Sequence, residues 1–223
     1  MAKGSIWRKW DLHIHTPESF SHQFKFENEE DRKRYNDNIW DKYIDELEKV
    51  DDVSVIGITD YFFIDGYKKV LEYRKKGRLP KFNLILPNIE LRLDIFVDGE
   101  RLDYHILFSD KLSPETIEND FIRNLETSNY YQESRSISRE NIEKIGKEFK
   151  QHEQAFQGKS DFIIGCIQTS VSLEKVKDIL EKNKRIFDGN YMLVIAGEGW
   201  GKLRWGSEEH NPRRKLLVSS HAM

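Results

Sequence analysis

The 223-residue sequence has one cysteine, few prolines and no long apolar run. Cys166, as the single cysteine, excludes an intrachain disulfide and gives no sign of an oxidising compartment. The first residues lack the apolar core of a signal peptide, and no apolar run reaches the length of a transmembrane helix. No stretch rich in proline, glycine or serine divides the chain. These absences predict a cytoplasmic protein without membrane contact and with a single domain over residues 1–223.

An excess of charge of one sign is also missing, since 36 lysine and arginine residues stand against 39 aspartate and glutamate residues. The resulting net charge of −3 excludes a general basic surface for nucleic acid. Contact with nucleic acid would therefore depend on a local patch. Short basic clusters such as residues 74–76 are more typical of solvated surface.

The most informative stretch is residues 10–16, Trp-Asp-Leu-His-Ile-His-Thr, in which apolar and polar residues alternate. Side chains at positions i and i+2 of a β-strand point to the same face, so Asp11, His13 and His15 share one face. Two imidazoles on one face of a strand can bind a single divalent metal ion. The alternative is a pair of solvated or hydrogen-bonded histidines.

Hydrophobic periodicity predicts strands and helices in alternation along the rest of the chain. The predicted strands are residues 53–58, 82–87, 91–97, 102–108, 162–167, 191–196 and 215–219. The predicted helices lie near residues 39–50, 65–76, 114–125, 139–156 and 173–180. Asp98-Gly99 predicts a hairpin turn, and residues 17–38 a long loop. This order favours an α/β fold with a mainly parallel sheet or barrel.

Candidate ligands for a metal ion lie on or just after successive predicted strands: Asp60 and Glu90 at the ends of two strands, and His105 on the return strand of the hairpin. Functional residues of parallel α/β folds gather at the carboxyl ends of strands, so we expect these side chains near the histidine pair. Carboxylates and imidazoles can hold the two divalent ions that suit hydrolysis of phosphate esters. Each residue has an alternative: Asp60 as a helix cap, Glu90 as a surface carboxylate and His105 as a structural histidine.

Four segments, taken in order, resemble the first four motifs of the PHP (polymerase and histidinol phosphatase) superfamily. They are Asp-Leu-His-Ile-His-Thr at 11–16, Gly-Ile-Thr-Asp at 57–60, Ile-Glu at 89–90 and His-Ile-Leu at 105–107. The resemblance covers residues 5–110. It implies a distorted seven-stranded, TIM-like β/α barrel, here expected to be incomplete at the carboxyl end, and two or three Mn, Zn or Fe ions that hydrolyse phosphoesters.

The resemblance also implies roles for individual residues. By position, the metal ligands are His13 and His15 for the first ion, Glu90 as the bridge, His105 for the second ion and His22 for the third. Asp60 is expected to orient one of these ligands without binding an ion itself. Residues 4–10, with 60–62, resemble a branch in which this domain is fused to an AAA- or SMC-like ATPase. We therefore expect a phosphoester substrate, such as a nucleic acid or nucleotide, and an ATPase partner.

The sequence departs from the family at several positions. Tyr61 stands where the family has histidine, and a phenol with a pKa near ~10 is a poor ligand at neutral pH. A later His-Pro and a final Asp-x-His are not recognisable, although Glu198 and His221 fall near the expected positions. The leading prediction is a metal-dependent phosphoesterase or nuclease. The alternatives are a degenerate PHP domain that regulates an ATPase and, from another class, a barrel amidohydrolase or deaminase.

Overall fold

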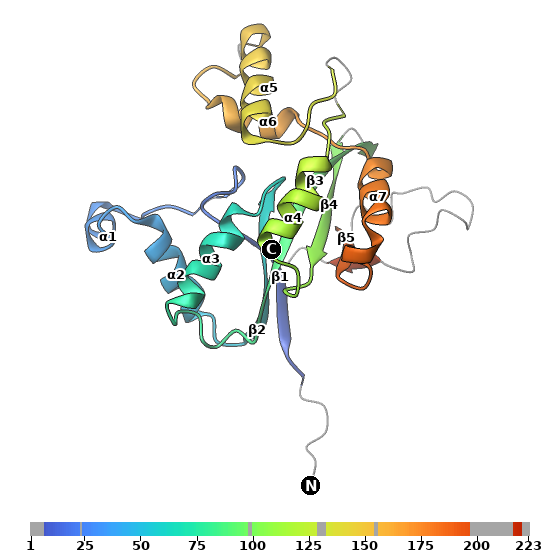
Figure 1. The fold of residues 1–223 in the computed structure, drawn as a ribbon. Helices are drawn as coiled ribbons and strands as arrows, with labels where there is room; N and C mark the ends of the chain where they lie inside the picture. Colours follow the sequence, from blue (N-terminus) through green and yellow to red (C-terminus); the bar gives the residue numbers. More distant parts are fainter. Residues whose placement is uncertain are drawn as a thin grey trace. The chain divides into compact units, whose positions relative to one another are not determined.

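The computed structural model describes residues 7–22, 24–97, 100–128, 133–153, 156–196 and 216–219 (Figure 1). The strands are β1 (Lys9–His15), β2 (Val53–Tyr61), β3 (Leu84–Val97), β4 (Glu100–Phe108), β5 (Tyr191–Ala196) and β6 (Leu216–Ser219). The helices are α1 (Glu29–Arg34), α2 (Ile39–Lys49), α3 (Asp65–Lys75), α4 (Pro114–Asp120), α5 (Arg139–His152), α6 (Asp161–Gln168), α7 (Leu173–Lys182) and α8 (Lys184–Phe187). The Cα positions group into two compact units, Met1–Asn88 and Ile89–Met223. The single domain expected over residues 1–223 stays a prediction.

The strands form one mixed sheet in the order β1-β2-β3-β4-β5-β6. Strands β1 and β2 are parallel, β4 and β5 antiparallel, and β5 and β6 parallel. The α/β class is confirmed, but the predicted seven-stranded barrel is wrong, because the described strands form an open sheet with β1 and β6 at its edges. One physical reason is that residues 162–167, expected to add a strand, form a helix instead.

Unit 1 contains β1, β2 and helices α1 to α3. Helix α2 begins after Asn38, whose side chain accepts a hydrogen bond from the Trp40 amide and so satisfies a donor at the helix start. The apolar side of α2 is buried, including Tyr43 and Ile44. The helices predicted near residues 39–50 and 65–76 are confirmed. The predicted loop 17–38 also contains the short helix α1, which has no buried residue.

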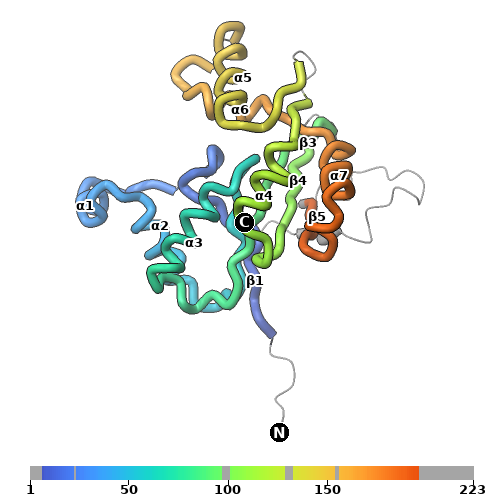
Figure 2. Tube along the Cα trace, viewed as in Figure 1, coloured from blue at the N-terminus to red at the C-terminus, as the bar shows by residue number. Residues whose placement is uncertain are grey.

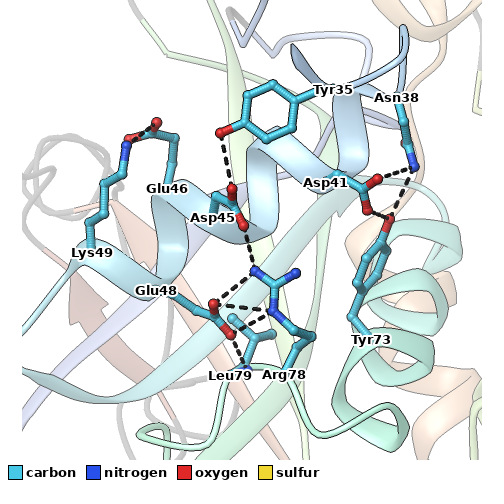
Figure 3. Close-up of polar contacts among 10 residues, drawn as sticks. All are labelled: Tyr35, Asn38, Asp41, Asp45, Glu46, Glu48, Lys49, Tyr73, Arg78 and Leu79. Atoms are coloured by element: carbon cyan, nitrogen blue, oxygen red, sulfur yellow. Dashed lines mark hydrogen bonds and ion pairs between the residues drawn. The ribbon is translucent and has the colours of Figure 1, made fainter.

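A polar cluster fastens the turn after α3 to helix α2 (Figure 3). Arg78 donates to Asp45 at 2.5 Å and to Glu48 at 2.8 Å, and the Leu79 amide donates to Glu48 at 2.6 Å. Leu79 has a φ of 60°, a left-handed conformation that a branched side chain rarely adopts. Two of these three bonds converge on the half-buried Glu48 carboxylate, and together the bonds stabilise the strained turn.

In unit 2, helices α5 and α6 pack side by side (Figures 1 and 2). Their backbones approach through two glycines: a Cβ on Gly146 would overlap the Asp161 carbonyl, and one on Gly165 would overlap the Ile142 carbonyl. The side chain of Ser160 accepts from the Ile163 amide at 3.2 Å and begins α6. The strand predicted for residues 162–167 is therefore wrong. A short apolar run fits a buried strand or a buried helix, and here the cap and the glycine contact favour the helix.

The rest of unit 2 follows the predicted elements more closely. Helix α4 begins at Pro114 after the Ser113 cap, and α7 and β5 lie where periodicity predicts them. The two strands expected at residues 82–87 and 91–97 are replaced by the single strand β3 (Leu84–Val97), which begins in unit 1. Asp98-Gly99, Glu198 and His221 lie outside the described residues. Among the described helices, none is long and apolar enough to cross a membrane.

Candidate metal site

The strand that carries the histidine pair is irregular at the residues between Asp11 and Ile14. Asp11 pairs with Ile56 and Ile14 with Ile58, so β1 uses one more residue than β2 over this interval. Such a β-bulge bends a strand and redirects its side chains. Gly57 faces the bulge, and a Cβ at this position would overlap the Leu12 carbonyl. Glycine at position 57 therefore lets β2 approach the irregular part of β1.

His13 and His15 turn their Nε2 atoms toward each other. The two nitrogens lie 3.1 Å apart, and the rings meet edge to face with centroids 4.9 Å apart. Both side chains are half-buried. Nitrogens that are each ~2.0–2.1 Å from one ion lie about 2.9–3.4 Å apart, from octahedral to tetrahedral geometry. The observed separation fits two ligands of a single divalent ion.

The imidazole of His15 has two further neighbours in unit 1. Its Nδ1 lies 3.0 Å from the hydroxyl of Ser19, which is 2% exposed. Its ring stacks on Tyr61, with an angle of 8° between planes and centroids 5.6 Å apart. Phe20 packs against the Tyr61 ring, with centroids 4.4 Å apart. These contacts fix the orientation of the His15 ring.

Asp60, predicted as a ligand-orienting carboxylate, lies at the end of β2 and is 3% exposed. It accepts hydrogen bonds from the Thr16 hydroxyl at 2.7 Å and from the Gly66 amide at 2.9 Å. The second bond satisfies a donor in the first turn of α3, so the helix-cap alternative describes part of its role. Burial raises the pKa of Asp60 to about 7, against these two hydrogen bonds, which lower it.

The first residues of β3 are anchored within the same unit. The Asn88 amide donates to the Leu12 carbonyl at 2.8 Å and to the Thr59 hydroxyl at 3.0 Å. Asn88 is 3% exposed, so these bonds form away from water. They hold the first residues of β3 against the bulged segment of β1, at the residue that precedes His13.

Glu90 and His105 belong to unit 2, on β3 and β4. Each is 3% exposed, and Glu90 Oε1 lies 3.9 Å from His105 Nε2. Glu90 is therefore not the surface carboxylate of the alternative interpretation. His105 is held in register by the antiparallel pairing of β4 with β5, where it faces Val194. A buried carboxylate beside a buried imidazole is a donor pair suited to a divalent ion.

His22 lies two turns beyond the pair, on the loop that begins at Thr16. Its amide donates to the Ser19 carbonyl at 3.3 Å, and its half-buried side chain has an Nδ1 atom without a hydrogen-bond partner among the described residues. Tyr61, which stacks on His15, is 6% exposed. The roles of His22 and of the other predicted ligands stay predictions.

Two buried hydroxyl residues near the site were not identified from the sequence as site residues in their own right. Thr16 is fully buried and bonds to Asp60, and Ser19 bonds to His15. Thr16 is part of the quoted 11–16 motif, so a signal for it was present. Ser19 follows His15 by four residues inside a polar loop, where no periodicity singles out one hydroxyl.

Comparison with known proteins assigns no family. No protein-family model matches the sequence, and no curated protein matches it. Among solved structures, the chain is similar to a presumed metal-dependent phosphoesterase from Bifidobacterium adolescentis. That similarity has 12% identity and a TM-score of 0.41, and it covers 91% of this chain and 72% of the other. A similarity at this level assigns no function to the chain.

Proposed function

We propose that this chain binds divalent metal ions through His13 and His15 and hydrolyses phosphoester bonds. The observation that carries the proposal is the approach of the two Nε2 atoms to 3.1 Å on one face of a bulged strand. Two neutral imidazoles form one hydrogen bond in this geometry, whereas one ion would engage both lone pairs. The hydrogen bond between the Ser19 hydroxyl and Nδ1, the far nitrogen of His15, is the kind of outer contact that metal-ligating histidines usually have.

Glu90 belongs in this proposal because of chain continuity along β3. Asn88 is bonded to Leu12 and Thr59, and Glu90 follows it by two positions on the same strand. Residues i and i+2 of a strand point to the same face. We therefore propose the Glu90 carboxylate as a third ligand, in addition to the imidazoles of His13 and His15. This combination suits zinc, manganese or iron.

His105 extends the donor set toward a second ion. Its imidazole nitrogen lies 3.9 Å from Glu90, and a carboxylate can bind two ions through its two oxygens. Glu90 is therefore the proposed bridge, with His105 on the second ion. Both residues are nearly inaccessible to solvent, and a buried carboxylate is stabilised when it coordinates a cation.

Divalent ions held by these residues would supply Lewis acidity toward a phosphoryl oxygen. The chain's own contribution is to hold the ligands. Thr16 and Asp60 fix the end of β1, and Tyr61 covers one face of the His15 ring. A phosphoester is the proposed substrate class, and a nucleic acid or nucleotide stays a prediction within it.

The proposal can be tested by replacing the histidine pair. We expect His13→Ala combined with His15→Ala to abolish Mn²⁺-dependent hydrolysis of bis(4-nitrophenyl) phosphate or of 4-nitrophenyl phosphate. His152→Ala is the matched control, because His152 is an exposed histidine on α5. Wild-type hydrolysis that is equal with and without metal, or equal in the double variant, would contradict the proposal.

A second candidate function is a metal-binding module without catalysis, which Tyr61 favours. Tyr61 is buried, stacks on His15 and stands where the PHP motif has a ligating histidine. A third metal ion would therefore lack a histidine ligand at this position. Bound metal without turnover of either nitrophenyl ester would support this candidate. Its role as a regulatory part of an AAA- or SMC-like ATPase stays a prediction.

A further inference from the structure

We infer that Ser19 is a positioning residue that accepts a hydrogen bond from His15 Nδ1–H and so fixes the tautomer in which Nε2 carries the lone pair for the metal ion. The inference rests on the proposed metal binding and names a residue that the four motifs do not include. Its starting point is the 3.0 Å separation between the Ser19 hydroxyl and His15 Nδ1.

A neutral imidazole has one N–H and one lone pair, and the hydrogen bond made by one nitrogen decides which role the other takes. When Nδ1–H of His15 donates to Ser19, the lone pair lies on Nε2. That atom is the one 3.1 Å from Nε2 of His13. The Ser19 hydroxyl can accept from Nδ1–H or donate to a bare Nδ1, and only the accepting arrangement leaves the Nε2 lone pair of His15 for an ion. In the inferred arrangement Ser19 accepts, so that both histidines ligate through the same type of nitrogen.

Ser19 is itself held in place by a short hydrogen-bonded turn. Its amide donates to the Thr16 carbonyl at 3.0 Å, and its carbonyl accepts from the His22 amide at 3.3 Å. Thr16 is fixed in turn by Asp60 and by the Glu18 amide, which donates to its hydroxyl at 3.1 Å. With 2% exposure, the Ser19 side chain has little access to water as an alternative partner.

A second contact prevents the imidazole from flipping freely. The nearly parallel stack on Tyr61 sets the plane of the His15 ring, and Phe20 packs against the Tyr61 ring in turn. The stack sets the plane of the His15 ring, but it does not determine which of the two ring nitrogens carries the proton. A Ser19 hydroxyl that accepts from Nδ1–H makes that distinction, so removal of the hydroxyl should change the tautomer while the ring stays stacked.

The first experiment measures the tautomer of His15 in the metal-free chain, from the ¹⁵N NMR signals of its ring at mildly alkaline pH. We expect the Nδ1–H form to dominate in the wild type and the Nε2–H form to increase in Ser19→Ala. Ser21→Ala is the matched control, because Ser21 is an exposed serine on the same loop. An unchanged tautomer ratio in Ser19→Ala would overturn the inference, whether or not the chain binds metal.

The second experiment measures Mn²⁺ affinity by calorimetry. Loss of an outer partner of a ligating histidine lowers metal affinity by about 10- to 100-fold. We expect this loss for Ser19→Ala, wild-type affinity for Ser21→Ala and recovery in Ser19→Thr, which keeps the hydroxyl. Thermal melting in chelator checks that each variant is folded. Wild-type affinity in folded Ser19→Ala would refute the role of Ser19, whereas no binding by the wild type would refute the proposed function instead.

Discussion

Asp60 should make the stability of the metal-free chain depend on pH in an unusual direction. Its carboxylate is 3% exposed, and burial raises its pKa to about 7, whereas an unfolded aspartate titrates near ~3.9. Between these two values the folded state binds a proton that the unfolded state does not. The contribution of Asp60 to the free energy of unfolding therefore falls as pH rises from about 4 to about 7, and it is constant outside this window.

The magnitude follows from the separation of the two pKa values. About three pKa units correspond to about 4 kcal/mol, an upper value that is spread over the whole window. Asp60→Asn removes the titration and keeps an acceptor for the Gly66 amide, so this variant should lose the slope. Relative to the wild type, it should gain stability as pH rises.

Urea denaturation in the presence of chelator, at about pH 5 and about pH 7, measures this difference. Asp51→Asn is the control, because the Asp51 side chain is 97% exposed. We expect the stability difference between Asp60→Asn and the wild type to change by about 2–3 kcal/mol between the two pH values, and that for Asp51→Asn to stay constant. Equal pH slopes for the wild type and Asp60→Asn would refute the reasoning.

Two predictions concern the scaffold. Gly165→Ala should destabilise the chain by about 1–3 kcal/mol or more, because its Cβ would overlap the Ile142 carbonyl, whereas the exposed Lys147→Ala should change stability by less than about 0.5 kcal/mol. Equal urea midpoints for these two variants would contradict the close contact of α5 and α6. Arg78→Ala should cost about 1–2 kcal/mol in the same assay, because it leaves the half-buried Glu48 without its guanidinium partner. An unchanged midpoint would mean that solvent replaces this ion pair at no cost.

The sequence predicts most helices of the fold because their signals are local. Helix α4 has Ser113 and Pro114 at its start, and α2 has a regular apolar face. Residues 162–167 were misjudged because six apolar residues carry no period that separates strand from helix. What decides there is the contact of Gly165 with another helix, which depends on the tertiary structure. The open sheet was not predicted because the order of strands and helices fits either a sheet or a barrel, and the resemblance implied the barrel.

The candidate site could be predicted only in part, for a related reason. Alternation along residues 10–16 puts His13 and His15 on one face, and the structure has their Nε2 atoms 3.1 Å apart. The bulge opposite Gly57 and the hydrogen bond to Ser19 could not be predicted, because each depends on which segments meet in space. The alternation of residues along one strand identifies the donor pair. The orientation of the two imidazoles depends on neighbours that no sequence periodicity identifies.

The most direct measurement of the central claim is metal binding by the histidine pair. We predict that the wild-type chain, purified and titrated with Mn²⁺ or Zn²⁺, binds at least one ion per chain by elemental analysis and calorimetry. His13→Ala with His15→Ala should lose this ion, and the exposed His152→Ala control should keep it. Equal metal content in the wild type and the double variant would contradict the account.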